Sequence, residues 1–128
     1  MDIEHAVTEK VETLSLQPFV PSGPDFKLAC DFFCDLGFTK TWENGGYAGF
    51  CCGNAKFILQ DYNQPEFANN LMIRIDVSDL DAWWKQISTL NLDAKYKGVR
   101  LSAPADFPWG REVNIIDPAG VCWHIGAP

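Results

Sequence analysis

Few side chains in this sequence could carry acid–base or nucleophilic chemistry. Of the two histidines, His5 lies near the N-terminus and His124 near the C-terminus. Histidine titrates near neutral pH, so His124 could act as a general acid or base if a neighbouring group oriented it. The alternative is a histidine that lines a binding site and holds a hydrogen bond. No nucleophile elbow, phosphate-binding loop or zinc-finger spacing accompanies it.

The cysteines indicate a reducing compartment rather than a protein held together by disulfides. Their number is odd, no Cys-x-x-Cys pair occurs, and Met1–Glu12 lacks the apolar core of a signal peptide. Cys30 and Cys34, four residues apart on an expected helix, are interpreted as small apolar residues near a core. We therefore expect a cytoplasmic protein without a disulfide framework. The five cysteines are Cys30, Cys34, Cys51, Cys52 and Cys122.

Length and charge exclude several classes of protein. The chain has 128 residues, of which 47% are hydrophobic, enough for one domain with its own core. Its 17 acidic residues outnumber its 10 basic residues and give a net charge of −7. This balance disfavours nucleic acid and anionic membranes as partners. No apolar run approaches the roughly 20 residues that cross a bilayer.

The expected helices and strands fall into two similar halves joined by a polar linker, Asn63–Asn70. In the first half, strands are expected at Leu14–Val20, Phe38–Glu43, Tyr47–Cys52 and Ala55–Tyr62, with a helix from a cap at Ser22 or Gly23 to Gly37. In the second half, a strand is expected at Leu71–Val77, a helix from Ser78 to Asn91, strands or turns at Ala94–Leu101, Arg111–Ile116 and Val121–Ile125, and a Pro-rich loop at Ser102–Trp109.

The two helix ends, Leu36-Gly37 and Leu90-Asn91, are 54 residues apart, as in a repeated supersecondary unit. We predict an α+β fold of two βαβββ modules, about 13–62 and about 70–126. They form a single domain, residues 13–128, after a flexible leader at 1–12. One such unit leaves a sheet face uncovered, so two units pair into a curved, cup-like mixed sheet with helices on its outer face. The cup is the expected ligand site.

Three segments occur in an order and spacing typical of one superfamily. They are Phe32-Phe33-Cys34-Asp35-Leu36-Gly37-Phe38, Ile73-Arg74-Ile75-Asp76-Val77-Ser78-Asp79-Leu80-Asp81, and Pro108-Trp109-Gly110-Arg111-Glu112 followed by Asp117-Pro118-Ala119-Gly120. They resemble the glyoxalase, bleomycin-resistance protein and extradiol-dioxygenase superfamily, also called vicinal oxygen chelate proteins. The resemblance covers about residues 14–125 and implies the same cup-shaped fold.

In metal-dependent members of that superfamily three strand positions carry the metal ligands. The resemblance places these positions at Gln17, Asn70 and His124. Two neutral amides and one imidazole are a weak set for Zn²⁺, Ni²⁺ or Mn²⁺, which favour imidazole, thiolate or carboxylate. We therefore expect no metal and no other cofactor, and the enzyme activities of the superfamily are not carried over.

In lacking these metal ligands, the sequence resembles the bleomycin-binding branch of the superfamily. Its members keep the fold, lack the metal ligands and have a histidine after an Asp-Pro-Ala-Gly turn. In this sequence the turn Asp117–Gly120 leads to His124 in the same way. Those proteins hold a cationic glycopeptide in grooves at a dimer interface, which implies a homodimer here.

Strand alternation and turn position select the residues expected to line the cup. If the isoleucines of the strand at Leu71–Val77 face the helices, Met72 and Arg74 point into the cup. Arg74 would then pair with a carboxylate such as Asp76 or Glu112, or bind an anionic ligand group. The expected ligand-binding residues are Gln17, Phe50, Ile58, Gln60, Asn70, Met72, Arg74, Trp109, Glu112 and His124.

Three functions are compatible with these inferences. The first is a metal-independent protein that sequesters an aromatic, neutral or cationic small organic compound, such as an antibiotic. The second is a glyoxalase-like or dioxygenase-like lyase or isomerase that uses a metal, or His124 as acid–base group. The third is a module that senses a small molecule. Stoichiometric metal with turnover would identify the second function, and tight binding without turnover the first.

Overall fold

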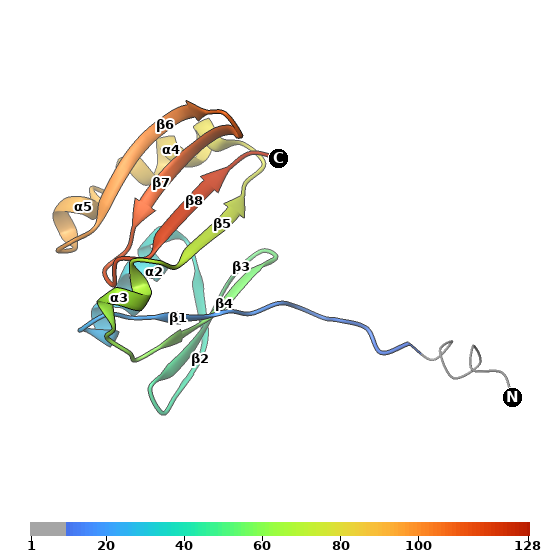
Figure 1. Cartoon of the computed structure of the whole chain (residues 1–128), viewed down its shortest axis with the longest axis vertical. Coiled ribbons are helices and arrows are strands. Elements are labelled where there is room, and N and C mark those ends of the chain that lie inside the picture. The colour runs from blue at the N-terminus through green and yellow to red at the C-terminus, as the bar shows by residue number, and fades with distance from the viewer. Residues whose placement is uncertain (1–9) are drawn as a thin grey trace, which may run out of the picture.

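The chain forms two four-stranded sheets, each covered by a helix on one face (Figure 1). The computed structural model describes residues 10–128. The first half contains β1 (Phe19–Pro21), α2 (Phe26–Leu36), β2 (Thr39–Asn44), β3 (Tyr47–Cys52) and β4 (Ala55–Gln60). After α3 (Pro65–Ala68), the second half contains β5 (Met72–Asp76), α4 (Leu80–Ser88), α5 (Leu92–Lys95), β6 (Arg100–Phe107), β7 (Gly110–Ile116) and β8 (Cys122–Gly126). None of the helices in this described part is long and apolar enough to cross a membrane.

The two sheets have the same topology. Their strand orders are β1-β4-β3-β2 and β5-β8-β7-β6. In each sheet the first strand is parallel to its neighbour and the other pairs are antiparallel. The predicted α+β fold of two βαβββ-like modules is confirmed, although each module forms its own sheet rather than half of a continuous one.

The helix boundaries repeat with the spacing found in the sequence. Asp25 caps α2 and Asp79 caps α4, and each carboxylate accepts a hydrogen bond from the backbone N–H three residues later, at 3.0 Å. The caps expected at Ser22 or Gly23 and at Ser78 are therefore wrong. A carboxylate satisfies the same free N–H groups, and its charge also complements the helix dipole.

Left-handed residues follow both helices, as predicted. Gly37 has φ 116° and directly follows α2, where glycine is favoured because it has no Cβ. Asn91 has φ 51°, which asparagine tolerates better than most residues. The second helix ends slightly earlier than expected, at Ser88, and Asn91 lies between α4 and α5.

One hydrophobic core lies between the modules. Phe33 of α2 contacts Phe57 of β4, with ring centroids 4.8 Å apart, and Trp123 of β8, at 5.4 Å. Phe32, also on α2, contacts Tyr96 after α5 at 5.5 Å. The buried faces of the two sheets therefore share one core, and their opposite faces point away from it.

The segment before β1 differs from the prediction. The sequence predicts a strand from Leu14, whereas β1 begins at Phe19 and residues 10–18 extend away from the sheets (Figure 1). Pro18 has no N–H to donate, which limits pairing at this end to its carbonyl oxygen. Leu14 and Leu16 are 90% and 87% exposed. Most of the expected leader at 1–12 lies outside the described residues.

A strand replaces most of the expected Pro-rich loop. Pro104 lies within β6, at the point where the pairing with β7 shifts between Ser102 and Ala105. Proline is tolerated there because β6 is an edge strand and the irregular pairing requires no N–H from this residue. Trp109 is consequently at the tip of the β6–β7 hairpin. Short helices α3 and α5 also occupy parts of segments expected as linker and strand.

Candidate functional site

The outward face of the second sheet, here called the polar face, carries half of the predicted site residues. Residues paired across a ladder project to the same side of a sheet, so the register defines adjacent rows. The rows are Met72–Cys122–Ile116, Arg74–His124–Asn114 and Asp76–Gly126–Glu112. Contacts across these rows and with the hairpin tip form the Glu112 cluster, which consists of Arg74, Asp76, Trp109, Glu112, Cys122 and His124.

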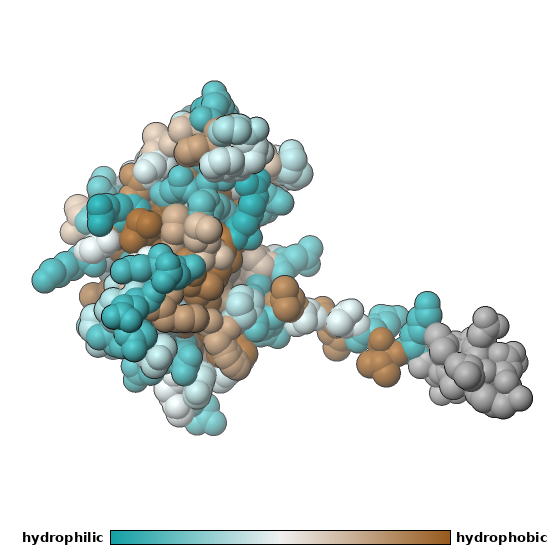
Figure 2. All heavy atoms as spheres, in the orientation of Figure 1, coloured by the Kyte–Doolittle hydropathy of each residue, from teal (hydrophilic) through white to brown (hydrophobic). Residues whose placement is uncertain are grey.

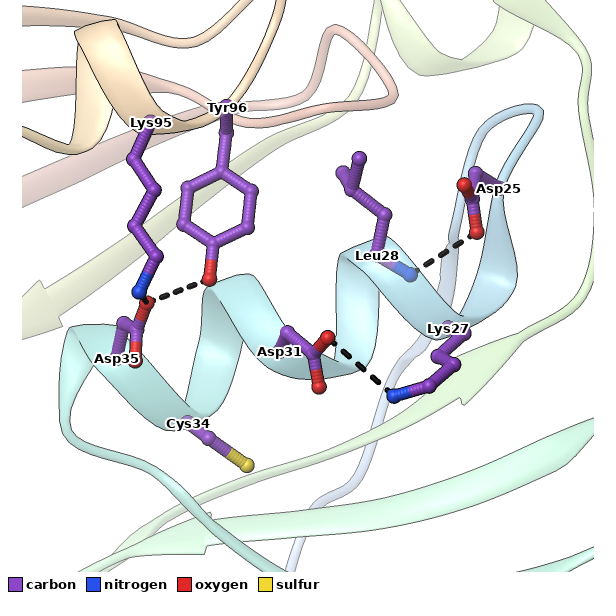
Figure 3. A pocket seen from close by; sticks show the side chains of 8 residues that line it. All are labelled: Asp25, Lys27, Leu28, Asp31, Cys34, Asp35, Lys95 and Tyr96. Carbon is purple, nitrogen blue, oxygen red and sulfur yellow. Dashed lines mark hydrogen bonds and ion pairs between the residues drawn. The ribbon is translucent and has the colours of Figure 1, made fainter.

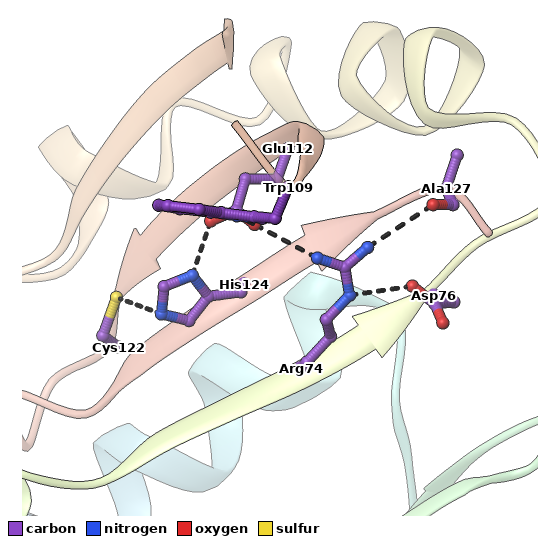
Figure 4. Close-up of polar contacts among 7 residues, drawn as sticks. All are labelled: Arg74, Asp76, Trp109, Glu112, Cys122, His124 and Ala127. Atoms are coloured by element: carbon purple, nitrogen blue, oxygen red, sulfur yellow. Dashed lines mark hydrogen bonds and ion pairs between the residues drawn. The ribbon is translucent and has the colours of Figure 1, made fainter. Parts of the chain in front are cut away.

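Glu112 is the centre of this cluster, and its side chain is only 1% exposed (Figure 4). One carboxylate oxygen accepts hydrogen bonds from Trp109 Nε1 at 2.8 Å and from Arg74 Nη1 at 3.2 Å. The other oxygen lies 2.5 Å from His124 Nδ1. Burial alone would raise the pKa of Glu112, but the hydrogen bonds from His124 and Trp109 and the nearby positive charge lower it below the ordinary 4.5. The carboxylate is therefore ionised at neutral pH.

Arg74 lies across the sheet toward Glu112. Its Nε donates to Asp76 at 3.0 Å and its Nη2 to the carbonyl oxygen of Ala127 at 3.4 Å. Gly126 permits this path, because a Cβ at that position would overlap the guanidinium. The predicted pairing of Arg74 with Asp76 and Glu112 is confirmed. Two carboxylates outnumber the one guanidinium, so with a neutral imidazole the cluster carries net negative charge.

His124 connects the carboxylate to a thiol. Its Nε2 is 3.5 Å from Cys122 Sγ, two residues earlier on β8. An ionised carboxylate can only accept, so Glu112 keeps the proton of the neutral ring on Nδ1 and leaves the Nε2 lone pair facing the thiol. Burial, followed by the charges of Glu112 and Asp117, raises the pKa of Cys122. The thiol is therefore protonated at neutral pH.

Trp109 is exposed yet held in one orientation. Its side chain is 63% exposed, while its indole N–H is bound to the buried carboxylate of Glu112. The ring also stacks on Phe107, with centroids 5.0 Å apart and planes 10° apart. Most of the indole surface therefore remains available to a ligand although the ring is fixed by two contacts.

The turn before β8 is fixed by Asp117, which is 1% exposed. Its oxygens accept hydrogen bonds from the backbone N–H groups of Ala119, Gly120 and Val121 and from the indole N–H of Trp123. Burial raises the pKa of Asp117 to about 6, although these four hydrogen bonds act in the opposite direction and lower it. The Asp-Pro-Ala-Gly turn noted in the sequence thus sets the start of β8, which carries Cys122 and His124.

The outward face of the first sheet, here called the aromatic face, lacks a comparable polar cluster among its described residues. Its exposed aromatic residues are Phe19, Trp42 and Tyr47, which are 50%, 44% and 38% exposed. The indole of Trp42 lies over Gly49, where a Cβ would overlap it. Ile58 and Gln60, two of the predicted lining residues, pair with Gly49 and Tyr47 and so belong to this face.

Phe50, by contrast, is a predicted lining residue that lies in the core. It is 1% exposed and stacks on Phe57 with centroids 5.3 Å apart. It also contacts Phe33 of α2 at 5.8 Å. The alternation of β3 therefore has the opposite phase to the prediction, because Phe50 packs against α2 and Ala48, on the same side of the strand, is fully buried.

The residues at the superfamily's metal positions do not come together within one chain. Gln17 precedes β1 and donates to Ser15 Oγ at 3.0 Å, while Asn70 follows α3 and donates to the carbonyl oxygen of Glu66 at 3.0 Å. Both side chains are exposed, and His124 lies on β8. Within residues 10–128 no group of three or more His, Cys, Asp and Glu side chains could hold a metal ion. Neither the donor set nor its placement fits the superfamily's metal.

Two hollows of the described part lie outside the Glu112 cluster, and the second borders it only at Asp76. One lies between α2 and α5 (Figure 3), where Lys95 Nζ and the Tyr96 hydroxyl both donate to Asp35, at 2.6 and 2.5 Å. These bonds lower the pKa of Asp35 and tie the two modules together. The other is a largely apolar groove of about 740 Å³ beside α4 and the β3–β4 turn.

Sequence reasoning missed three residues of this region, Cys122, Phe107 and Asn114. The i, i+2 spacing of Cys122 and His124 on one strand is the signal that places both on one face. Asn114 pairs with His124 in the register, and its buried Oδ1 has no hydrogen-bond partner among the described residues. A ligand N–H or O–H group could supply that partner.

Comparison with known proteins gives matches in structure but not in sequence. The sequence matches no protein-family model and no curated protein. The bleomycin-binding protein of Streptomyces verticillus, complexed with copper(II)-bleomycin, is 24% identical with a TM-score of 0.76 over 92% of this chain and 98% of that chain. An antibiotic-binding protein from a Streptomyces species is 22% identical, with a TM-score of 0.69 over 92% and 98%. A glyoxalase/bleomycin resistance protein from Catenulispora acidiphila is 25% identical, with a TM-score of 0.67 over 91% and 99%.

These values establish the architecture of the chain rather than its ligand. The matches span nearly the full length of each compared structure, so both modules are included. The chain therefore has the two-module fold of the glyoxalase, bleomycin-resistance and dioxygenase superfamily, and its structural matches include proteins of the bleomycin-binding branch that the sequence resembles.

Proposed function

We propose that this protein is a metal-independent binding protein that sequesters an aromatic, neutral or cationic small molecule, such as an antibiotic, on its polar face. The observation that carries the proposal is Trp109, an indole 63% exposed yet bound to a buried carboxylate. Fixing the ring before binding lowers the entropy lost when a ligand stacks on it. Similarity to a bleomycin-binding and an antibiotic-binding protein supports the same class of ligand.

The charge of the polar face favours a neutral or cationic ligand. Arg74 is engaged with Asp76 and Glu112, so it is not free to receive an anionic group. The net charge of −7 raises the local concentration of cations and repels anions. A cation over the Trp109 ring would gain about 0.5–2 kcal/mol from the aromatic face.

We also propose that a second copy of the chain completes the binding cup. The polar face and the aromatic face both point away from the shared core, so neither covers the other within one chain. Exposed apolar side chains continue along residues 10–18, where Figure 2 shows hydrophobic groups on the extended segment. A twofold homodimer that places the aromatic face of one chain over the polar face of its partner would cover both faces.

The state of the cysteines supports a reducing compartment for this protein. All five are free thiols, including the exposed Cys34 and Cys52. Exposed free thiols persist where glutathione and thioredoxin keep them reduced. We therefore extend the proposal to a cytoplasmic location, which fractionation with an epitope-tagged chain would test.

Intrinsic tryptophan fluorescence tests the ligand proposal. Bleomycin and the planar cation 9-aminoacridine should quench the emission saturably. The planar anion acridine-9-carboxylate should bind about tenfold more weakly at low salt. Trp109→Phe should remove most of the quenching, whereas Trp84→Phe, at a half-buried position on α4, should preserve it. Tighter binding of the anion, or no saturable change with any of the three probes, would contradict the proposal.

Light scattering tests the dimer. The mass of the wild type should be about twice 14.3 kDa at micromolar concentration. Trp42→Glu on the aromatic face should give monomers, because it places a charge in the proposed interface. Leu90→Glu is the matched control, since Leu90 is also 44% exposed but follows α4 on the helical side. A monomeric wild type would rule out this arrangement.

A further inference from the structure

Cys122, His124 and Glu112 form a line of three side chains on the polar face (Figure 4). The thiol Sγ is 3.5 Å from His124 Nε2, and His124 Nδ1 is 2.5 Å from Glu112 Oε2. This is the order of a nucleophile, its general base and the group that orients the base. Strand β8 supplies both the thiol and the ring because residues i and i+2 share a face, and β7 supplies the carboxylate.

The carboxylate is held by more than its contact with the imidazole. Its other oxygen accepts bonds from Arg74 and Trp109, so it cannot turn away from His124 without breaking all three contacts. The neutral ring therefore keeps its proton on Nδ1, and the lone pair of Nε2 stays on the side of the thiol. Burial of Glu112 to 1% exposure prevents water from replacing these bonds.

Among the cysteines of the described chain, this arrangement is particular to Cys122. His124 is the only histidine in residues 10–128. Cys30 is buried, and burial raises its pKa to about 11. Cys34 and Cys52 are exposed, but no imidazole can lie beside them within this part of the chain. Since the Cys122 thiol is protonated at rest, its attack on a ligand depends on the base next to it.

We propose that Cys122 captures electrophilic ligands covalently, and that these ligands are flat α,β-unsaturated carbonyl compounds such as quinones. The inference rests on the proposed function, because the electrophile would lie on the polar face against Trp109. A bond forms between Sγ and the β-carbon while the carbon–carbon π bond breaks, and its electron pair becomes an enolate. The thiol proton passes to His124 Nε2 and then to the α-carbon, so nothing is oxidised and no group leaves.

Conjugate addition suits this site better than acyl transfer. Acyl transfer places negative charge on an oxygen beside the nucleophile and needs donors preorganised for it. Arg74, the cation next to the triad, is already bound to two carboxylates, and β8 is hydrogen-bonded to β5 on one side and β7 on the other. Conjugate addition needs only one base, which accepts the thiol proton and returns it to the α-carbon. Met72 and Ile116, which flank Cys122 in its row, provide apolar surroundings for a flat ligand.

N-ethylmaleimide, a small conjugated imide, tests the reactivity of Cys122 directly. Peptide mass mapping over time gives the rate of modification at each cysteine in the same sample, and the exposed Cys34 serves as an internal reference. Relative to Cys34, modification of Cys122 should slow at least about tenfold in His124→Ala and in Glu112→Gln. Glu66→Gln, at an exposed position on α3, should leave the ratio unchanged. Circular dichroism establishes that each variant is folded.

Equal ratios of the Cys122 to the Cys34 modification rate in the wild type, His124→Ala and Glu112→Gln would overturn the inference. An unmodified Cys122 in a sample whose Cys34 is fully modified would also overturn it. If His124→Ala does not fold, His124→Gln replaces it with the same expectation. Titration of the wild type with 9-aminoacridine, which is not a conjugated carbonyl compound, measures the proposed function separately. Binding without base-dependent modification of Cys122 removes the covalent step alone. Modification without binding contradicts the ligand site but supports the reactive thiol.

Discussion

Replacing Glu112 with glutamine tests how the polar face is built. The two side chains have nearly the same shape, so Glu112→Gln removes a charge and an acceptor without opening a cavity. The amide oxygen can keep the bonds from Trp109 and Arg74, which places the amide –NH₂ opposite His124 Nδ1. Two N–H groups cannot share a hydrogen bond, so the imidazole must carry its proton on Nε2, toward Cys122.

The expected loss is about 3 kcal/mol of the free energy of unfolding. A hydrogen bond to a charged group contributes about 1.5–3 kcal/mol, and breaking a buried ion pair costs about 3–5 kcal/mol. Arg74 is 40% exposed and keeps its ion pair with Asp76, which reduces the cost at the guanidinium. Glu112 is buried, so water does not replace the negative charge that strengthens all three of its hydrogen bonds. For a chain of this length, such a loss lowers Tm by about 10 °C.

Denaturant unfolding of the wild type, Glu112→Gln and the exposed control Glu66→Gln measures this loss, and the control should change by no more than about 0.5 kcal/mol. The pKa of Glu112 is lowered in the folded state, so its ionised form contributes stability above the ordinary pKa of 4.5. That contribution is lost as the pH falls through the lowered value, and the difference between wild type and Glu112→Gln should shrink there.

Nitrogen NMR of the His124 ring gives a second readout. The proton of the neutral ring should lie on Nδ1 in the wild type and on Nε2 in Glu112→Gln. A variant as stable as the wild type at neutral pH, with an unchanged ring tautomer, would refute the placement of Glu112 at the centre of the cluster.

Two other outcomes concern the metal and the packing of the polar face. Elemental analysis of the purified protein should show well under one equivalent of zinc, nickel, manganese or iron, because the positions of Gln17, Asn70 and His124 offer a poor ligand set; a full equivalent that is lost in His124→Ala would contradict this. Gly126→Ala should lower the free energy of unfolding by about 1–3 kcal/mol, since the new Cβ displaces the Arg74 guanidinium. An unchanged free energy of unfolding in denaturant would show that the position of the guanidinium over Gly126 does not contribute to stability.

The fold could be predicted because its strongest signals are local. The left-handed conformation of the residue after each helix depends mainly on its own residue type and its neighbours in the chain. Gly37 and Asn91, which are 54 residues apart, both adopt it. The pairing of Arg74 was predictable for a different reason, since the side chain was expected inside the cup and an unpaired buried charge is costly. The phase of β3 was not predictable. Its residues are apolar on both faces, so the burial of Phe50 depends on aromatic side chains elsewhere in the fold, Phe33 of α2 and Phe57 of β4.

The Glu112 cluster depends on strand register, which the sequence does not encode locally. Glu112 and His124 are 12 residues apart and meet because β7 and β8 pair with Glu112 opposite Gly126 and Asn114 opposite His124. The buried Asp117 fixes the turn that sets this register. The residue types of the site and the pairing of Arg74 could therefore be predicted from the sequence, but not the contacts of Glu112 with Trp109 and His124.

The same strands keep the fold and the chemistry of the polar face separate. On β8, Trp123 and Ile125 belong to the core, while Cys122 and His124 alternate with them on the polar face. Substitutions in the outward set can change the chemistry of the polar face without replacing any side chain of the core. They are still coupled to one another, because Glu112 already accepts bonds from three partners and holds the ring of His124. Introducing histidine or glutamate at position 17 or 70 would therefore add a ligand without directing His124 toward it, because Glu112 holds the ring with its free nitrogen, Nε2, beside the Cys122 thiol.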